Sequence, residues 1–480
     1  MGGGRRRPPL TPIPDQREAV YNNNTGRPQS EQQYTNVFDL SPRQEVDSFQ
    51  FLHQPTFGAR SARELESRGG KRRGHERVAV DGTRGQRRQT PRGARGDVLT
   101  KQHVKLIENL SSASAIFSSS LYSQLRKNAS SDIVFSPFSV HVALTMTYLG
   151  AQKATAREMI KVLGLSKLRK NKAHSAYAAL LQTSQLSTSV ELNLANAVFV
   201  KPNLPVEETF RQGLVQMYRA KFGHFDFSAV GGPETPINTW VGNVTKGKIP
   251  DFLAPGTIDN TTAMIIVNAL YFKGSWLKTF RLADTAEEPF YLDDGTTVTV
   301  PMMKQEDNFK YKRSQNLKAD IVELPYKDQR YSIFIVLPVS RGTLSQVEQS
   351  LKMEELTSEL ESMGNDKVKL FLPRFKSKSR FSLKEPMKRL GMRSSFNTKR
   401  ANFRGISSGN QLFISDVIHE AVVEVNEEGT EASAATAVKI SFKSRPFRTV
   451  NFRADHPFLY IIRDNTYKMV LFMGRYTGVA

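Results

Sequence analysis

Residues 99–480 are predicted to form one α+β domain, on three observations about the order of apolar patterns. Apolar residues recur at helical spacing in the first part of this region, short apolar runs typical of strands dominate from about residue 190, and helical patterns separate several of these runs. Helices followed by a mixture of strands and helices are typical of α+β domains with extended sheets. At 480 residues the chain is long enough for one large domain and additional material.

The additional material is residues 1–98, which we expect to be a disordered basic extension. This segment is rich in Gly, Arg, Pro, Gln and Asn and has few large apolar side chains. Such a composition cannot bury enough apolar surface to offset the entropy lost on ordering. Residues 51–98 contain 12 Lys and Arg against 5 Asp and Glu, whereas residues 1–50 contain 6 of each.

The folded region is predicted to begin with four helices and one short strand. Apolar residues from Val104 to Leu121 recur at helical spacing and predict the first helix. A short strand at 132–136 leads through Pro137 into a nearly all-apolar helix at 139–149, which we expect to be buried. Two further helices are predicted at 154–163, closed by Gly164, and at 167–183.

Strands and helices then alternate irregularly, and we find no internal repeat. The predicted strands are 190–200, 263–272, 298–303, 321–324, 331–337, 368–372, 411–416, 417–425, 458–463 and 469–476. The predicted helices among them are 206–218, 236–245, 344–351, 353–363 and 383–390.

The formal net charge of +22 favours polyanionic partners, namely nucleic acid, sulfated glycans or acidic membranes. One candidate site for such a polyanion is a cluster of four cations at the start of the predicted 167–183 helix, where the positive charges oppose the helix dipole. This cluster is either a solvated helix face or a heparin-like sulfated-glycan site. It consists of Lys167, Arg169, Lys170 and Lys172. Nucleic-acid binding has no support other than the net charge, so we do not expect a nucleic acid as a partner.

The sequence signals that bear on the location of the protein disagree with one another. The N-terminus is charged but has no apolar core, so no signal peptide is visible, and no apolar run reaches the roughly 20 residues of a membrane helix. Glycosylation sequons nevertheless suggest secretion. In the folded region they fall at Asn109, Asn128, Asn243 and Asn260. We expect an extracellular glycoprotein, with an intracellular protein as the alternative.

The sequence gives little support for catalysis, so we do not expect an enzyme. There is no cysteine, the eight histidines form no close ligand pair, and no phosphate-binding glycine loop occurs, which leaves no metal or cofactor site to propose. The segment 405–409 fits the G-x-S-x-G nucleophile pattern, but a predicted loop precedes it and a strand follows. A nucleophile elbow needs a strand before it and a helix after it.

The most informative segment follows the apolar run 417–425 and is built from acids, a glycine and then small residues. Its first two positions resist burial, and its glycine permits a large change of backbone angles. The small side chains that follow can enter a tight gap between strands without a clash. The segment therefore suits a hinge that is exposed in one state and buried in another. Its residues are Glu427, Glu428, Gly429, Thr430, Glu431, Ala432, Ser433, Ala434 and Ala435.

An ordered set of motifs across about residues 100–480 resembles the serpins, the serine protease inhibitor superfamily. The motifs are the hinge itself, Phe135 to Ser139, Asn238 to Val241, Val267 to Trp276, Pro301 to Met303, Glu323 to Tyr326, Leu372 to Phe375, Leu390 to Met392, Asp455 to Phe458 and Leu471 to Arg475. Residues 1–98 lie outside the resemblance. Within the family, the chain looks most like extracellular, arthropod-like members.

The resemblance implies a fold of about nine helices and three β-sheets with an exposed reactive-centre loop at about residues 427–450. It also implies a shutter and a breach that control the main sheet, with His419 hydrogen-bonded to Asn268. The residues that carry over are Ser136, Ser139, Asn238, Asn268, Trp276 and His419. In such a protein a protease attacks the loop, which then inserts as a new central strand and traps the acyl-enzyme.

The side chains of the hinge agree with an inhibitory member. Alternate residues of a strand share a face. One face would carry Thr430, Ala432, Ala434, Thr436 and Val438, none of which is charged or larger than Val. In non-inhibitory relatives charged residues, bulky residues or Pro often interrupt this face. The alternative is a non-inhibitory serpin that binds a glycan, matrix or other partner through its basic surface.

The resemblance also implies the position of the cleaved bond. Inhibitory serpins mostly place the reactive residue sixteen positions after the Glu that opens the hinge, and this count leads from Glu427 to Lys443, with Ser444 following. Lys at this position suits a trypsin-like protease, whose specificity pocket carries a carboxylate. Arg445 precedes Pro446, and Phe442 and Arg448 give loops of the wrong length. We expect a monomeric inhibitor whose partner is a trypsin-like serine protease.

Overall fold

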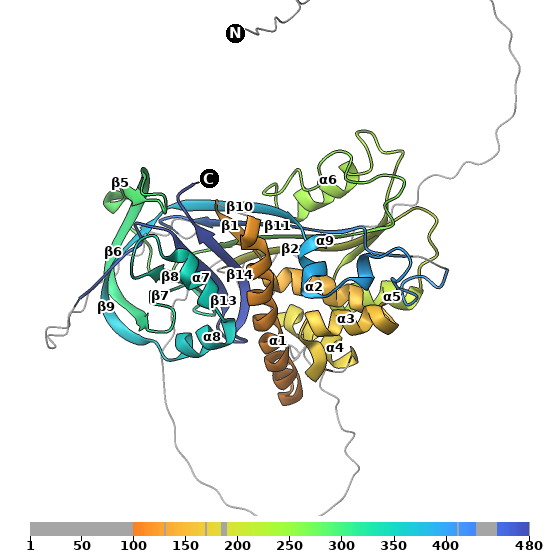
Figure 1. The fold of residues 1–480 in the computed structure, drawn as a ribbon, viewed down its shortest axis with the longest axis horizontal. Helices are drawn as coiled ribbons and strands as arrows, with labels where there is room; N and C mark the ends of the chain where they lie inside the picture. The colour runs from red at the N-terminus through yellow and green to blue at the C-terminus, as the bar shows by residue number, and fades with distance from the viewer. Residues whose placement is uncertain are drawn as a thin grey trace, which may run out of the picture. The chain divides into compact units, whose positions relative to one another are not determined.

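The computed structural model describes residues 99–128, 131–168, 170–183, 190–409, 412–428 and 449–479. These residues form nine α-helices and two hydrogen-bonded β-sheets (Figure 1). The predicted disordered extension at residues 1–98 lies outside the described residues, and so does most of the predicted reactive-centre loop, from Gly429 to Arg448.

The smaller sheet has five strands in the order β10-β11-β4-β2-β3. At its centre β11 pairs with β4 in parallel, from Asp416 opposite Ile265 to Val423 opposite Phe272, and antiparallel neighbours flank this pair. The strands are β2 (Val190–Val200), β3 (Lys221–His224), β4 (Met264–Gly274), β10 (Phe375–Ser382) and β11 (Asp416–Val425). The parallel pair joins segments that lie about 150 residues apart in the sequence.

The larger sheet has nine strands in the order β1-β14-β13-β8-β7-β6-β9-β12, with β5 paired to β6. Its strands are β1 (Ile133–Phe135), β5 (Ala286–Tyr291), β6 (Thr297–Ser314), β7 (Ala319–Pro325), β8 (Tyr331–Pro338), β9 (Gly364–Pro373), β12 (Val450–Arg453), β13 (Phe458–Asp464) and β14 (Met469–Tyr476). The three predicted sheets are therefore two in the described residues. The reason is that β6, 18 residues long, pairs with β5 near its start and with β7 at its end, which joins two regions into one network.

Helices cover both faces of the smaller sheet, as Figure 1 shows edge-on. On one face α6 packs through Ile237 and Val241 against a cluster that includes Val267 of β4 and Val422 of β11. Most other helices lie on the opposite side, around the main core. The helices are α1 (Lys101–Leu125), α2 (Pro137–Tyr148), α3 (Lys153–Val162), α4 (Lys170–Thr183), α5 (Glu208–Gly213), α6 (Thr235–Val244), α7 (Leu344–Ser350), α8 (Met353–Glu361) and α9 (Lys384–Leu390).

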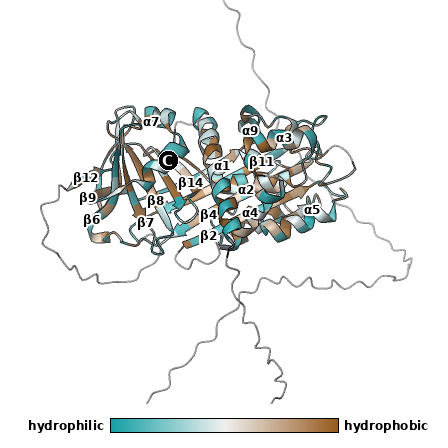
Figure 2. Cartoon of the chain, turned by 90° about the horizontal axis from the view of Figure 1, so that it is seen from below, coloured by the Kyte–Doolittle hydropathy of each residue, from teal (hydrophilic) through white to brown (hydrophobic). Residues whose placement is uncertain are grey.

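The buried helix α2 shows how the local sequence specifies its own element. Ser136 caps the N-terminus by accepting a hydrogen bond from the Ser139 backbone N–H at 3.0 Å, and Pro137 occupies the first turn, where its missing N–H has no intrahelical partner. Every residue of α2 is buried, as the apolar sequence predicts. Figure 2 shows the matching distribution, with hydrophobic residues concentrated on the strands and polar residues on the outer helices.

Several predicted boundaries were wrong for identifiable reasons. The helix predicted from residue 167 begins at Lys170, because Gly164 has a left-handed φ of 65°, a 3₁₀ turn spans Leu165–Lys167 and Leu168 is extended. The strand predicted at 411–416 is absent from 412–415, where the Ile414 and Ser415 N–H groups bond to loop and strand-end carbonyls. The helix predicted at 206–218 is the short α5 followed by a π-helical turn, Leu214–Tyr218.

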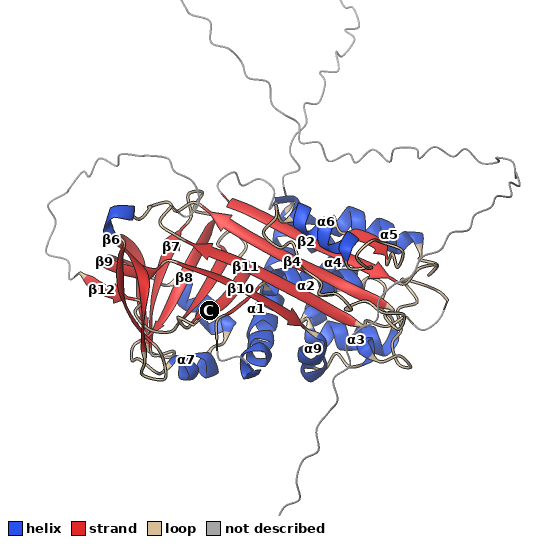
Figure 3. Cartoon of the chain, turned by 90° about the horizontal axis from the view of Figure 1, so that it is seen from above, coloured by secondary structure: helices blue, strands red, loops and turns tan. Residues whose placement is uncertain are grey.

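Four strands were not predicted, namely β3, β5, β10 and β12. All four lie at a sheet edge or off the main path of strands, and β10 also alternates apolar or small residues with Lys and Arg. Such strands obtain their pairing from a neighbour and carry a weak apolar pattern of their own. Figure 3 shows β10 beside β11 and β4 in the five-stranded sheet.

The packing around Gly474 generates a stability prediction. Gly474 lies inside β14, and a methyl group there would overlap the Ile133 carbonyl oxygen and the Tyr460 ring. Because overpacking a core commonly costs about 1–3 kcal/mol, we expect Gly474→Ala to lower the free energy of unfolding by at least that amount. The strand residue Gly364 has open space around it, so Gly364→Ala is the matched control and should have little effect. Urea unfolding curves compare the variants, and equal midpoints for both would contradict the described packing.

Candidate functional site

The centre of the five-stranded sheet is held by a buried histidine on β11. The Nε2 atom of His419 accepts a hydrogen bond from the Ser136 backbone N–H at 2.9 Å, so the proton of the neutral ring is on Nδ1. Nδ1 lies 3.2 Å from the Asn268 carbonyl oxygen of β4 and donates to it. His419 therefore links the two central parallel strands to the N-terminus of α2.

A chain of side-chain hydrogen bonds extends this link across β4. Ser139 Oγ donates to Asn268 Oδ1 at 2.9 Å, and Asn268 Nδ2 donates to Asn196 Oδ1 of β2 at 2.6 Å. All of these groups are buried, so each would lose its partner without access to water if the strands were simply pulled apart. The network spans α2, β11, β4 and β2, and we name it the shutter network: Ser136, Ser139, Asn196, Asn268 and His419.

Burial also fixes the charge of the shutter network. Removal of His419 from water lowers its pKa to about 3, because the low-dielectric surroundings disfavour the imidazolium. The side chain is therefore neutral at physiological pH. A second buried histidine, His141 of α2, has its pKa lowered to about 4 by the same cause.

Trp276 lies at the carboxyl end of the β4–β11 pair and holds the two chains together there. Its indole ring stacks on Tyr326 with centroids 4.5 Å apart, and its Nε1–H donates to the Asn426 carbonyl oxygen at 2.8 Å. The Phe280 N–H donates to the Glu427 carbonyl oxygen at 2.9 Å. The chain that leaves β11 is thus held against the segment that follows β4.

Glu427 is the more firmly anchored of the two hinge residues that the structure describes. Its buried carboxylate accepts a hydrogen bond from Thr285 Oγ1 at 2.9 Å and lies 3.5 Å from Nη1 of Arg374. Glu428, by contrast, is exposed. The rest of the predicted hinge, from Gly429 to Ala435, and the predicted bond between Lys443 and Ser444 lie outside the described residues.

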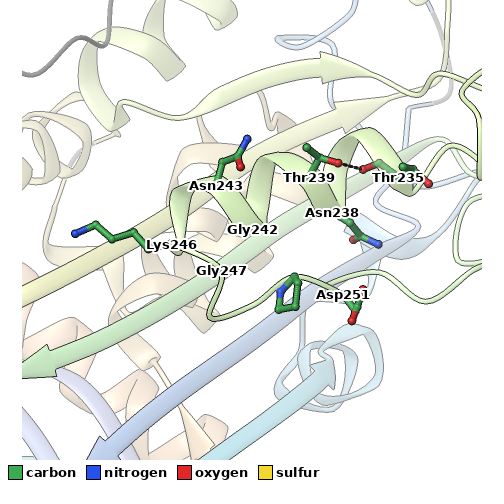
Figure 4. Close-up of a pocket in the computed structure, with 9 residues that line it drawn as sticks. Thr235, Asn238, Thr239, Gly242, Asn243, Lys246, Gly247 and Asp251 are labelled. Carbon is green, nitrogen blue, oxygen red and sulfur yellow. Dashed lines mark hydrogen bonds between the residues drawn. The ribbon is translucent and has the colours of Figure 1, made fainter.

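Asn238 was predicted with the shutter and breach residues, but the structure places it elsewhere. It lies on α6, where its Nδ2 donates to the Leu253 carbonyl oxygen at 2.9 Å and its Oδ1 accepts from the Leu253 N–H at 2.7 Å. The reason is that α6 crosses the outer face of the sheet, with apolar residues between it and β4. Figure 4 shows Asn238 beside a groove of about 590 Å³ between α6 and the segment that returns beneath it.

The predicted glycan cluster is only partly described. Lys167 and Lys172 are exposed and lie in different elements, the 3₁₀ turn and α4. Arg169 and the side chain of Lys170 lie outside the described residues.

The predicted glycosylation sites differ in accessibility. The Asn243 and Asn260 side chains are exposed, whereas Asn109 is half-buried in α1. The hydroxyl residues of all three sequons are buried, namely Ser111, Thr245 and Thr262. The side chain of Asn128 lies outside the described residues.

Four residues of the site were not predicted: Asn196, Thr285, Tyr326 and Arg374. Asn196 carried a signal, because it is a polar residue inside the apolar run that forms β2. Tyr326 and Arg374 belong to motifs of the family resemblance, but only the fold shows their contacts with Trp276 and Glu427. Thr285 gave no signal, since its contact with Glu427 spans 142 positions.

The nucleophile pattern at 405–409 has no elbow geometry. Ser407 is buried in a loop whose nearest preceding element is a 3₁₀ turn rather than a strand. The part of the chain described by the structure contains no cluster of three potential metal-binding side chains. Within the same residues, no helix combines the length and apolarity required to span a membrane.

The buried histidines generate a prediction about pH. The unfolded chain binds a proton on each His near pH 6.5, but folded His419 and His141 bind one only near pH 3 and 4, so stability present above pH 6.5 is lost as the pH falls below it. Each contributes a slope of about 1.4 kcal/mol per pH unit. We expect His419→Gln to reduce the slope of unfolding free energy between pH 6 and 4.5 by about one proton.

The exposed His224 provides the control, and His224→Gln should leave this slope unchanged. Denaturant unfolding at several pH values measures it. A slope unaffected by the change at His419 would contradict the neutral, buried state assigned to that side chain.

Comparisons with known proteins agree with this geometry. The family model described as "Serpin (serine protease inhibitor)" matches residues 112–478. The chain is 39% identical to the leukocyte elastase inhibitor of Xenopus laevis over 381 residues, which cover 78% of this chain and all of that protein. It is 35% identical to antithrombin-III of Mus musculus over 378 residues, 76% of this chain and 81% of that one.

Solved structures give the same result. Serpin48 from the insect Tenebrio molitor aligns with a TM-score of 0.70 at 30% identity and covers 78% of this chain and 98% of its own. Uncleaved ovalbumin aligns with a TM-score of 0.70 at 31% identity, covering 77% and 99%. These matches confirm the predicted α+β serpin fold, and the chain belongs to the serpin family of serine protease inhibitors.

Proposed function

We propose that this serpin is a suicide-substrate inhibitor of a trypsin-like serine protease. The observation that carries the proposal is the direct parallel pairing of β4 with β11, with the hinge following Val425, the last residue of β11. Similar proteins are named as inhibitors of leukocyte elastase and as antithrombin-III. In the proposed mechanism, the five-stranded sheet is the state that precedes insertion.

The topology supports insertion of the loop between these strands. A chain that leaves the carboxyl end of β11 and folds back must run antiparallel to β11 and also to β4, because the two are parallel. One parallel ladder of eight residue pairs would be replaced by two antiparallel ladders, which are slightly more stable per residue. About a dozen added hydrogen bonds at roughly 1 kcal/mol each give on the order of 10 kcal/mol.

The faces of the neighbouring strands explain why small hinge residues matter. Val417, Ala421 and Val423 of β11 belong to the main core, and Ile418 and Val422 face the cluster beneath α6. An inserted strand would meet packed apolar residues on the core side. The alternate residues from Thr430 to Val438 have no charge to bury there.

The reactive bond is proposed between Lys443 and Ser444. The support is the count of sixteen from Glu427, whose anchored position marks the end of β11. A lysine at this bond pairs with the carboxylate in the specificity pocket of a trypsin-like enzyme. Phe442 would direct the protein towards a chymotrypsin-like enzyme instead.

We further infer that the protein acts as a secreted monomeric glycoprotein. The exposed asparagines of the sequons at Asn243 and Asn260 support glycosylation, and Asn260 is the better acceptor because it lies in a loop, whereas Asn243 lies on α6.

Titration with a trypsin-like protease tests the inhibitory proposal. We expect an SDS-stable covalent complex and release of a peptide that begins at Ser444, because the acyl-enzyme is trapped before hydrolysis. Lys443→Ala should slow formation of the complex by orders of magnitude, since the specificity pocket then has no cation to bind. Cleavage of the loop without a covalent complex and without a rise in thermal stability would instead indicate a non-inhibitory serpin.

The two faces of the hinge generate a second prediction. Thr430→Arg places a charge on the face that must be buried during insertion, so we expect the inhibitor to become a substrate. Glu431→Arg is the matched control, because the residue on the other face already carries a charge and the change replaces one charged side chain with another. The stoichiometry of inhibition should rise several-fold for the first variant and stay near the wild-type value for the second. Equal stoichiometries would contradict the assignment of faces.

A further inference from the structure

A second charged surface lies away from the hinge, on α3, the end of α9 and the loop that follows. We name it the α3–α9 basic surface, and it consists of Lys153, Arg157, Lys161, Arg389, Arg393, Lys399, Arg400 and Arg404. All eight side chains are exposed. Within the described part of the chain none of them forms an ion pair, unlike Lys278, Lys352 and Lys367, which do.

Contacts between the two segments assemble the surface. The Asn402 N–H donates to Thr155 Oγ1 at 3.0 Å, and the Gln152 N–H donates to the Asn402 carbonyl oxygen at 2.9 Å. Glu158 accepts from both the N–H and the hydroxyl of Ser394 at 2.6 Å. Glu158 is the only acid within 152–162 and 388–405, and these bonds occupy its carboxylate. Glu385 of α9, just outside these ranges, pairs with Lys388 and also attracts Arg389, so the surface keeps an excess of cations rather than being free of acids.

The cations on α3 form a stripe. Lys153, Arg157 and Lys161 are spaced by four residues, so they lie on one face of the helix over about 12 Å. Like charges at this spacing repel and weaken the helix. A stripe that is unfavourable in the isolated protein becomes favourable when an extended polyanion lies along it.

We propose that the α3–α9 basic surface binds a sulfated polysaccharide. Five of its eight cations are Arg, whose planar guanidinium suits bidentate binding to oxyanions such as sulfate. Proteins that bind single-stranded nucleic acid add exposed aromatic side chains on which bases stack. Here the aromatic residues of the same segment, Phe396 and Phe403, are buried, so the surface offers charge without stacking.

The position of the surface determines what binding can do. The Ile414 N–H donates to the Ser395 carbonyl oxygen, which places this segment beside the start of β11 at Asp416, while the hinge leaves β11 after Val425. Ten strand residues separate these ends by about 33 Å. Figure 1 shows α3 and α9 on the opposite side of the molecule from β5 and β6. A glycan on this surface would tether the inhibitor with its loop directed away from the glycan.

A consequence follows that rests on the proposed inhibitory function. A segment of 14 residues from Thr430 to Lys443 would span about 46 Å when extended, which exceeds β11 by about 13 Å. The protease attached at Lys443 would emerge beyond Asp416, next to Ser395 and the basic surface. Complex formation would therefore displace the glycan and release the product from its tether.

Heparin affinity of the full chain tests the binding step. In Arg157→Ala/Lys161→Ala/Arg400→Ala we expect the Kd for heparin near 0.15 M NaCl to rise about tenfold or more, and the slope of log Kd against log[NaCl] to fall by about 2. The control Lys278→Ala/Lys352→Ala/Lys367→Ala has the same change in charge but removes paired cations, and should leave affinity near the wild-type value.

Three outcomes of this experiment would overturn the proposal. Equal losses in both triple variants would indicate general charge attraction. A loss only in Lys167→Ala/Lys172→Ala would assign binding to the α4 cluster. Tighter binding of poly(dT) than of heparin at the same salt concentration, lost in the first variant, would assign the surface to nucleic acid.

Release is tested separately with purified forms of the protein. We expect the covalent protease complex to elute from heparin at lower salt than the native protein. Loop-cleaved protein without an attached protease should elute like the native protein, because its surface is unobstructed. Equal elution of complex and native protein would overturn the release step alone. If no complex forms, the proposed inhibitory function is wrong, and the heparin measurements still show whether the basic surface binds the glycan.

Discussion

The parallel contact between β4 and β11 is the constraint on which the rest of this structure depends. It places two strands with the same direction at the centre of a sheet whose flanking pairs on either side are antiparallel. The arrangement satisfies the backbone hydrogen bonds of both strands, and antiparallel pairing with a strand added between them would be slightly more stable per residue. Under the proposed function, contacts around this pair hold the protein in its five-stranded form.

Those contacts lie at two places with different chemistry. The shutter network is a dry chain of polar groups in which His419 joins β11, β4 and α2, and each group is costly to leave without a partner. The other end is held by stacking of Trp276 on Tyr326 and by the anchored carboxylate of Glu427. Opening at the hinge end begins at the edge of the core and meets the buried polar groups later, so the strands would separate from Trp276 towards His419.

The two ends of β11 also separate two kinds of chemistry. The hinge leaves one end, where small residues follow an anchored glutamate, and the basic surface lies at the other, where cations of α3 and the 389–404 segment come together. A partner at one end does not obstruct the other while the sheet has five strands. Loop insertion would move the attached protease from the hinge end of β11 to the end beside the basic surface.

Much of this protein can be predicted from its sequence, because the relevant signals are local. The cap and apolar content of α2, the small residues of the hinge and their alternation between two faces depend only on neighbouring positions. The edge strands β3 and β12 were missed, since their pairing partners supply what their own patterns lack. Asn238 was grouped with the shutter, but its contacts are set by where α6 crosses the sheet.

By itself, the sequence determined the family, and it predicts the hinge and the face of the hinge that can be buried. Only the tertiary structure decided that residues 264–274 and 416–425 are adjacent and parallel, that Asn196 completes the shutter network, and that cations more than 220 residues apart share one surface. The physical reason is that strand pairing and surface charge depend on contacts between distant segments. The packing of the whole core, rather than any local sequence pattern, selects which distant strands pair.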